Sequence, residues 1–152
     1  MNTDYNKLYR ICKDRFSLDI DGIHGKRHWW SVRIIGLQIA KINGADINFI
    51  KTFALLHDCC RENDERDKKH AERAAEFAKS LWNKVVFLDG FEFYLLAEAL
   101  SGHNKKNNRS RTSCLEVHTC WDADRLNLPR LGVKIKPEYL CTDAARQIAQ
   151  NF

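Results

Sequence analysis

The sequence predicts an all-α fold, and three observations point to this class. Apolar residues recur at helical spacing through almost every segment, no segment alternates apolar and polar residues as a strand does, and the chain has only 2 prolines. The 152 residues are 44% hydrophobic, which is enough to bury one compact core. Because no internal repeat or Pro/Ser-rich linker divides the chain, we expect a single domain over residues 1–152, built as a bundle of about six to seven helices.

The first three helices are predicted by capping residues and by the spacing of apolar residues. The segment 3–17 begins with residues that cap helices and carries its apolar side chains at helical offsets. The second helix, 28–42, ends at an Asn-Gly pair, a common C-terminal stop. Asp46 can cap the third helix, which is predicted over 47–58.

Two charged loops and four further helices follow. The run CRENDERDKK lacks an apolar period and predicts a loop over 60–69, and the basic run 104–112 predicts another. The helix after the first loop is rich in alanine, Asp89 and Gly90 open the next, and the sixth stops near Pro129. The four helices are predicted over 70–82, 91–103, 113–126 and 142–152.

Composition excludes several classes of protein. The longest apolar stretches are only a few residues, too short to span a membrane, and the N-terminus MNTDYNKLYR lacks the pattern of a signal peptide. We therefore expect a cytoplasmic protein whose 6 cysteines are reduced thiols. The net charge of +5 suits an anionic ligand. A long nucleic acid would need a concentrated basic face. We therefore favour a solvated loop for the basic run over the alternative of an RNA or DNA contact, which would use Lys105, Lys106, Arg109 and Arg111.

Ionisable residues interrupt the apolar stripes of five predicted helices. They are His28, His57, His70, His103 and Asp124, each three, four or seven positions from apolar residues of its own helix. One inward histidine is more often a hydrogen-bonded core residue than a ligand, but five such residues together form the N and O donor set that divalent transition metals prefer. Asp58 adds a donor next to His57, and both can reach one ion only where the third helix ends. Asp122 falls about 200° from Asp124 around the sixth helix.

The order His28, His57-Asp58, Asp124 in an all-helical chain resembles the HD superfamily of metal-dependent phosphohydrolases. HWWSVRIIGLQIA is similar to the helix of the family's first histidine, FALLHD to its His-Asp doublet and DADRL to its closing aspartate. The resemblance covers about residues 20–130. It extends to an uncharacterised bacterial branch of HD domains through the segments HGKRHW, FALLHD, RENDERDKKHAERAA and CWDADRLNL.

The resemblance implies an HD-type helical bundle and a site with one or two divalent metal ions, drawn from Mn, Co, Ni, Fe, Mg or Zn. The primary metal ligands carried over are His28, His57, Asp58 and Asp124. His70 and His103 match the residues that bind a second metal in binuclear members or face the substrate in others. In the second case they would join Asp58 as catalytic residues that orient the nucleophile and move protons.

The activity implied is hydrolysis of phosphate ester or anhydride bonds in a small phosphorylated substrate, for example a nucleotide, as a phosphatase, phosphodiesterase or nucleotidase. Arg125 resembles a position at which relatives contact substrate phosphates, and Arg61 is an anion-binding residue three positions after Asp58. However, Ser31 and Arg61 depart from the side chains usual at these positions. The alternative is therefore a catalytically weak or inactive HD domain that binds metal or nucleotide in a regulatory role. The oligomeric state is left open.

Two further features are left with two interpretations each. His24 precedes His28 by four residues, and Gly25 places it in a loop, where it could cap the helix or contact the substrate side of the same site. Trp29, Trp30 and Trp121 flank expected ligands and could either line a base-binding pocket or belong to the core.

Overall fold

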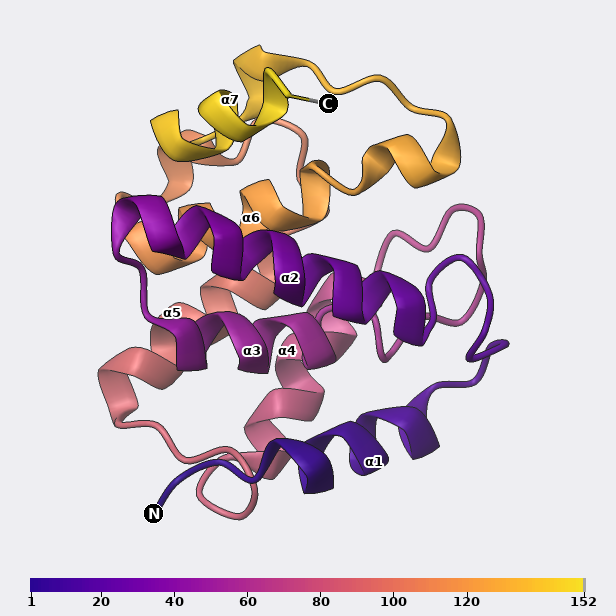
Figure 1. Ribbon diagram of the computed structural model, residues 1–152. Coiled ribbons are helices and arrows are strands. Elements are labelled where there is room, and N and C mark those ends of the chain that lie inside the picture. The colour runs from indigo at the N-terminus through magenta and orange to yellow at the C-terminus, as the bar shows by residue number, and fades with distance from the viewer. Residues whose placement is uncertain (152) are drawn as a thin grey trace.

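The computed structural model describes residues 1–151 and confirms the predicted all-α class (Figure 1). Within these residues seven α-helices follow one another, with three short 3-10 helices and an isolated bridge between Trp82 and Val86 but no sheet. The α-helices are α1 (Tyr5–Arg15), α2 (Lys26–Asn43), α3 (Ile47–Leu56), α4 (His70–Leu81), α5 (Gly90–Gly102), α6 (Leu115–Arg125) and α7 (Asp143–Ala149). The 3-10 helices are η1 (Arg109–Arg111), η2 (Leu128–Leu131) and η3 (Pro137–Tyr139).

Capping residues set the helix boundaries close to where the sequence predicts them. The side chain of Asp46 accepts hydrogen bonds from the first backbone N–H groups of α3, and Asp89 forms a capping box with Glu92 at the start of α5. Gly44 ends α2 in the left-handed conformation, at φ 80°. The last helix is shorter than predicted, because α7 ends at Ala149, and the final residue of the predicted range lies outside the described residues.

The helices share one hydrophobic core around α2, which packs against α3, α6 and α7. Figure 1 shows α1 at one end of this stack and α7 at the other. Close packing of α2 on α3 depends on Gly36, since a Cβ atom there would lie 2.5 Å from Cγ2 of Ile50. Gly102 similarly accommodates the ring of Trp121, whose indole N–H donates to the carbonyl of Ala99.

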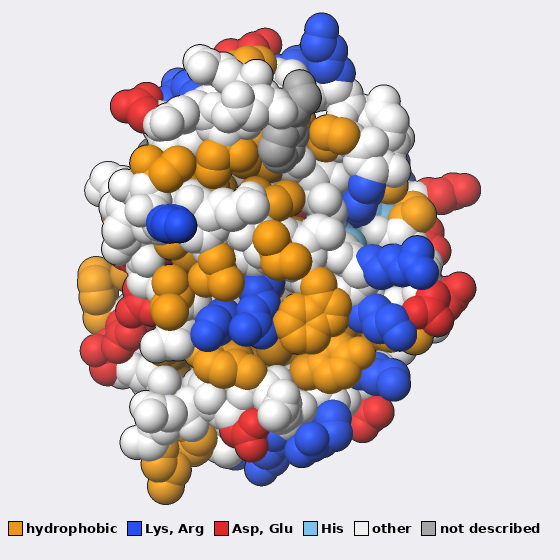
Figure 2. All heavy atoms as spheres, in the orientation of Figure 1, with side chains coloured by type: hydrophobic (Ala, Val, Ile, Leu, Met, Phe, Trp, Pro, Cys, Tyr) orange, Lys and Arg blue, Asp and Glu red, His pale blue; other side chains and the backbone are white. Residues whose placement is uncertain are grey.

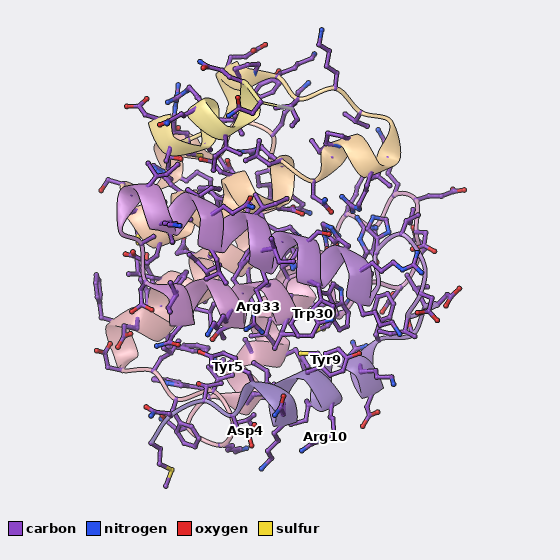
Figure 3. The ribbon with its side chains drawn as sticks, in the orientation of Figure 1. Asp4, Tyr5, Tyr9, Arg10, Trp30 and Arg33 are labelled. Atoms are coloured by element: carbon purple, nitrogen blue, oxygen red, sulfur yellow. The ribbon has the colours of Figure 1, made fainter. Side chains whose placement is uncertain are left out.

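The outer face of α2 carries exposed apolar side chains, which gather along this helix in Figure 2. Trp30 is 41% exposed and lies against Tyr9 of α1, with ring centroids 5.9 Å apart, and under the guanidinium of Arg33 (Figure 3). Trp29 and Trp121 are buried in the core. All three tryptophans thus take packing roles, and none of them lines the cavity described below.

Two findings bear on the composition-based predictions. No helix within residues 1–151 combines the length and the apolar character that crossing a membrane requires. All six cysteines are free thiols, and Cys120 packs in the core as the apolar stripe of the sixth helix predicts.

Candidate metal centre

The ends of five helices meet at one place and bring six ionisable side chains together. The packing of α2, α3, α5 and α6 fixes most of these ends, and α4 reaches the same point because it packs against α5. The six residues are His28 in the first turn of α2, His57 and Asp58 directly after α3, His70 at the start of α4, His103 directly after α5 and Asp124 in the last turn of α6. Five are buried, and Asp124 is partly exposed. The structure thus brings together the five residues that the sequence places on inward stripes, with Asp58 beside His57.

The first group of donors surrounds Nε2 of His28. This nitrogen lies 3.0 Å from Nε2 of His57, 3.2 Å from Oδ2 of Asp58 and 3.1 Å from Oδ1 of Asp124. The Nε2 atom of His57 lies 3.6 Å from each of the same two carboxylate oxygens. Asp58 can join His57 in this group because α3 ends at Leu56 and the chain turns immediately afterwards.

The second group uses the other oxygen of Asp58. Its Oδ1 lies 3.2 Å from Nε2 of His70 and 3.4 Å from Nε2 of His103, and these two nitrogens are 3.0 Å apart. The two groups, His28 with His57 and Asp58, and Asp58 with His70 and His103, each have the spacing needed to hold a metal ion. Asp58 is thus shared between two neighbouring donor sets.

Hydrogen bonds at Nδ1 fix the tautomer of all four histidines. Nδ1 of His57, His70 and His103 each donates to a backbone carbonyl three residues earlier, and Nδ1 of His28 donates to the amide oxygen of Asn127 at 2.8 Å. In a neutral imidazole the second nitrogen, Nε2, then carries only a lone pair. When the imidazoles are neutral, lone pairs and carboxylate oxygens face one another without a proton between them, an arrangement that a divalent cation satisfies.

The pKa shifts reflect the same crowding of acceptors. Burial acts to lower the pKa of His28, but hydrogen bonds to Asp124 and Asp58 raise it to about 9. Burial lowers the pKa of His57 to about 4. Burial acts to raise the pKa of Asp58, but the surrounding imidazoles, His57 foremost, hold it well below its usual range. Both carboxylates therefore stay ionised and can serve as ligands to a cation.

A cavity of about 480 Å³ opens beside the two donor groups. Its wall includes Asp58, His70, His103 and Asp124. Seven cationic side chains also line it, namely Arg61, Lys105, Lys106, Arg125, Arg130, Lys134 and Lys136. Figure 2 shows histidine atoms at the edge of the molecule, bordered by Lys and Arg side chains. The excess of cations over the two carboxylates favours an anionic ligand.

The two arginines expected to contact substrate differ in how their donors are used. Nε of Arg61 is buried without a hydrogen-bond partner among residues 1–151 and lies 3.6 Å from Oδ1 of Asp58. By contrast, both terminal nitrogens of Arg125 bind within the chain. Nη1 donates to the carbonyl of Tyr139, and Nη2 donates to the carbonyls of Lys105 and Lys106 and to Oδ1 of Asn108. Arg125 thus ties the basic loop to the segment after α6, which leaves its terminal nitrogens little capacity to bind a phosphate.

Sequence reasoning missed two residues near the site, Asn127 and Arg130. Asn127 orients His28 across a separation of 99 residues, and Arg130 lines the cavity while Nε donates to the carbonyl of Ile23. Asp122 is fully buried on the other side of α6, where its carboxylate accepts hydrogen bonds from Cys141 and Thr142. The angular separation from Asp124 predicted that Asp122 lies away from the site, but its own partners are distant in sequence and carried no signal.

Comparison with known proteins gives one informative match. No protein-family model matches the chain, and no curated protein matches it. A crystal structure of a predicted HD superfamily hydrolase from an uncultured Thermotogales bacterium matches with a TM-score of 0.74 and 28% sequence identity. The match covers 96% of this chain and 83% of that one.

This chain has the HD superfamily fold. The family resemblance predicted from four short segments is therefore confirmed over nearly the whole chain, as is the HD-type helical bundle. The buried His/Asp groups are compatible with metal binding, as in an HD domain. The matched protein is itself described as a predicted hydrolase.

Proposed function

We propose that this protein is a metal-dependent hydrolase of phosphate ester or anhydride bonds in a small phosphorylated substrate. The observation that carries the proposal is the shared carboxylate of Asp58, whose two oxygens each face a separate pair of imidazole nitrogens. Together with the cationic cavity next to it, this arrangement suits a negatively charged substrate bound beside metal.

In this proposal His28, His57, Asp58 and Asp124 hold the first ion, and His70 and His103 hold a second ion with Asp58 between the two. We assign His70 and His103 as ligands rather than proton donors because their Nε2 atoms face the same Asp58 oxygen and their Nδ1 protons are used by backbone carbonyls. Imidazole-rich donor sets favour Mn, Fe, Co, Ni or Zn over Mg, which prefers oxygen ligands.

A bound divalent ion would lower the pKa of a water molecule and offset negative charge on the phosphoryl group. The chain's own residues would orient and bind the reactants. Asp58 lies where it can fix the position of the attacking water, and Arg61, which lines the cavity beside Asp58, places a positive charge next to a phosphoryl oxygen bound there. Lys105 and Lys106 at the cavity wall would hold further negative charge of the substrate.

The test is phosphate release by the purified protein, stripped with a chelator and reloaded with each of the six metals. A panel of nucleotides, sugar phosphates and phosphodiesters should contain a substrate, and metal analysis should show at least one ion per chain. Asp58→Asn and His57→Ala should abolish release. His118→Ala is the matched control, because this histidine lies outside the cluster and its Nε2 bonds to the carbonyl of Arg109.

Failure to release phosphate from any substrate with any metal contradicts the proposal. Tight nucleotide binding without turnover would instead support the regulatory alternative, in which the side chains at Ser31 and Arg61 have lost the catalytic arrangement. Release that persists in Asp58→Asn would show that the activity comes from another site or from a contaminant.

A further inference from the structure

We propose that His24, held by Asp64, is the base that takes a proton from the attacking water in this cavity. The inference rests on the proposed function and adds a residue that lies outside both metal-binding groups. His24 precedes α2 in a loop, and it lines the same cavity as Asp58 and Arg61.

His24 lies beside the metal-binding groups rather than within them. Its ring centroid is 6.3 Å from that of His28, whereas the rings of His28 and His57 are only 4.9 Å apart. His24 therefore belongs to neither donor group but lies next to His28, where a base that acts on a bound water molecule would be placed. The side chain is 6% exposed, so its position is set by the protein rather than by solvent.

One hydrogen bond determines which nitrogen of His24 is free. Nδ1 donates to Oδ1 of Asp64 at 2.9 Å, so Nε2 carries the lone pair. Within residues 1–151 this Nε2 has no protein partner, yet it is not among the fully enclosed atoms that lack one. It therefore opens to the cavity, where it can accept a proton. The carboxylate that orients the imidazole and stabilises its charged form is Asp64, the arrangement that a histidine base requires.

The backbone on both sides of the pair is held in place. Gly25, the N-cap residue of α2, packs so closely that a Cβ atom there would lie 2.0 Å from the carbonyl oxygen of Ile20. The carbonyl of His24 accepts a hydrogen bond from the indole of Trp29 at 2.8 Å. In the loop that carries Asp64, the side chain of Asn63 accepts from a backbone N–H two residues later. These contacts hold the imidazole of His24 in one position, so that little conformational entropy is lost when it accepts a proton.

Burial favours the neutral form of the His24 imidazole, which is the form that can accept a proton. Burial lowers the pKa of His24 and outweighs the hydrogen bond to Asp64, which acts to raise it. Asp58 also acts to raise this pKa, and Arg61 and Arg130 act to lower it. Asp58, Arg61 and Arg130 line the same cavity as His24.

The proton and electron movements balance without any other reactant. A water O–H proton passes to Nε2 of His24 as the water oxygen forms its bond to phosphorus. The bond from phosphorus to the leaving oxygen breaks, and the leaving oxygen keeps the electron pair. The imidazolium then returns its proton to solvent at the cavity mouth. Asp64 stays ionised throughout, as a residue that positions and stabilises the ring.

The first experiment compares His24→Ala and His24→Gln with the wild type and with His118→Ala, all loaded with the metal that gives the highest activity. We expect kcat to fall about 10²- to 10⁴-fold, with the metal content unchanged. Added imidazole should restore part of the activity of His24→Ala and none of that of Asp58→Asn. A fall of less than about threefold, or the absence of any imidazole rescue, would overturn the proposal.

The second experiment needs no turnover and measures the His24 tautomer by nitrogen-15 NMR in the metal-free protein. In the wild type, Nε2 should give the shift of an unprotonated nitrogen. In Asp64→Asn, the side-chain amide can donate to Nδ1, and the proton should move to Nε2. Asp64→Asn should also lower kcat at unchanged KM. A protonated Nε2 in the wild type, or the same tautomer in both proteins, would refute the role of Asp64.

The two proposals fail in different ways. If the wild type releases no phosphate from any substrate, the proposed function fails whatever the NMR result. If the wild type is active but the His24 variants keep their kcat, the proposed function stands and His24 is not the base.

Discussion

Asp122 and Asp124 lie two residues apart in α6, and replacing each by asparagine should produce opposite defects. The two oxygens of Asp122 accept hydrogen bonds from the backbone N–H of Cys141 at 2.7 Å, from that of Thr142 at 2.8 Å and from the Thr142 hydroxyl at 2.8 Å. Asp124 instead faces the Nε2 atoms of His28 and His57, at 3.1 and 3.6 Å. One aspartate thus holds the C-terminal segment, and the other contributes to the donor group.

The magnitudes follow from these contacts. A hydrogen bond to a charged group contributes roughly 1.5–3 kcal/mol, and asparagine keeps only one of the two acceptor oxygens of Asp122. The stabilisation from these hydrogen bonds is partly offset by the cost of burying the carboxylate, which also raises the pKa of Asp122. We therefore expect Asp122→Asn to lower the free energy of unfolding by about 2–4 kcal/mol. Asp124→Asn should lower it by less than Asp122→Asn does in chelator, because Asp58 still lies beside Nε2 of His28, but it should weaken metal binding about 100-fold or more.

The assays are urea denaturation at neutral pH in the presence of a chelator and calorimetric titration with the preferred metal. Asp143→Asn serves as the control, because Asp143 is fully exposed and its ion pair with Arg146 should contribute little. Equal losses of stability in the two α6 variants would refute the division of roles. So would a full metal affinity in Asp124→Asn.

Three further substitutions test other parts of the structure. Asn127→Ala should weaken metal binding about 10- to 100-fold in a calorimetric titration, because it removes the acceptor that orients His28, and unchanged affinity would contradict this role. Gly36→Ala should lower the free energy of unfolding, measured by urea denaturation, by about 1–3 kcal/mol, because the new Cβ atom would overlap Ile50. A stabilised variant would show that α2 and α3 can separate at no cost. Lys106→Ala should raise KM about two- to fivefold at constant kcat, because an exposed cation at the cavity wall binds ground state and transition state alike. A fall in kcat alone would instead show that Lys106 stabilises the transition state.

The sequence predicted the fold well because its signals are local. Asp46 and Asp89 each cap the helix that they precede, and Gly44 takes the left-handed conformation expected at a helix end. These features depend on a few neighbouring residues, so single-sequence reasoning can find them. The length of the last helix depends on its packing against α2 and α6, which local spacing does not encode.

The donor residues were predictable for a related reason. His28, His57 and Asp124 occupy apolar stripes, and a polar residue on such a stripe is visible in the sequence. The role of Arg125 was not visible, because its partners lie 14 to 20 residues away in two loops without a periodic pattern. Asn127 belongs to the same category, since its partner is 99 residues distant. Irregular segments acquire their contacts only when the fold is complete.

The convergence of five helix ends has a consequence for the lifetime of the protein. An ion bound there would cross-link segments from residue 28 to residue 124 and would bind the folded chain but not the unfolded one. By mass action, free metal at 100 times its dissociation constant would add about 2.7 kcal/mol to the free energy of unfolding. A cell short of that metal would then degrade the protein faster, so the amount of enzyme, and not only its activity, would follow the metal supply.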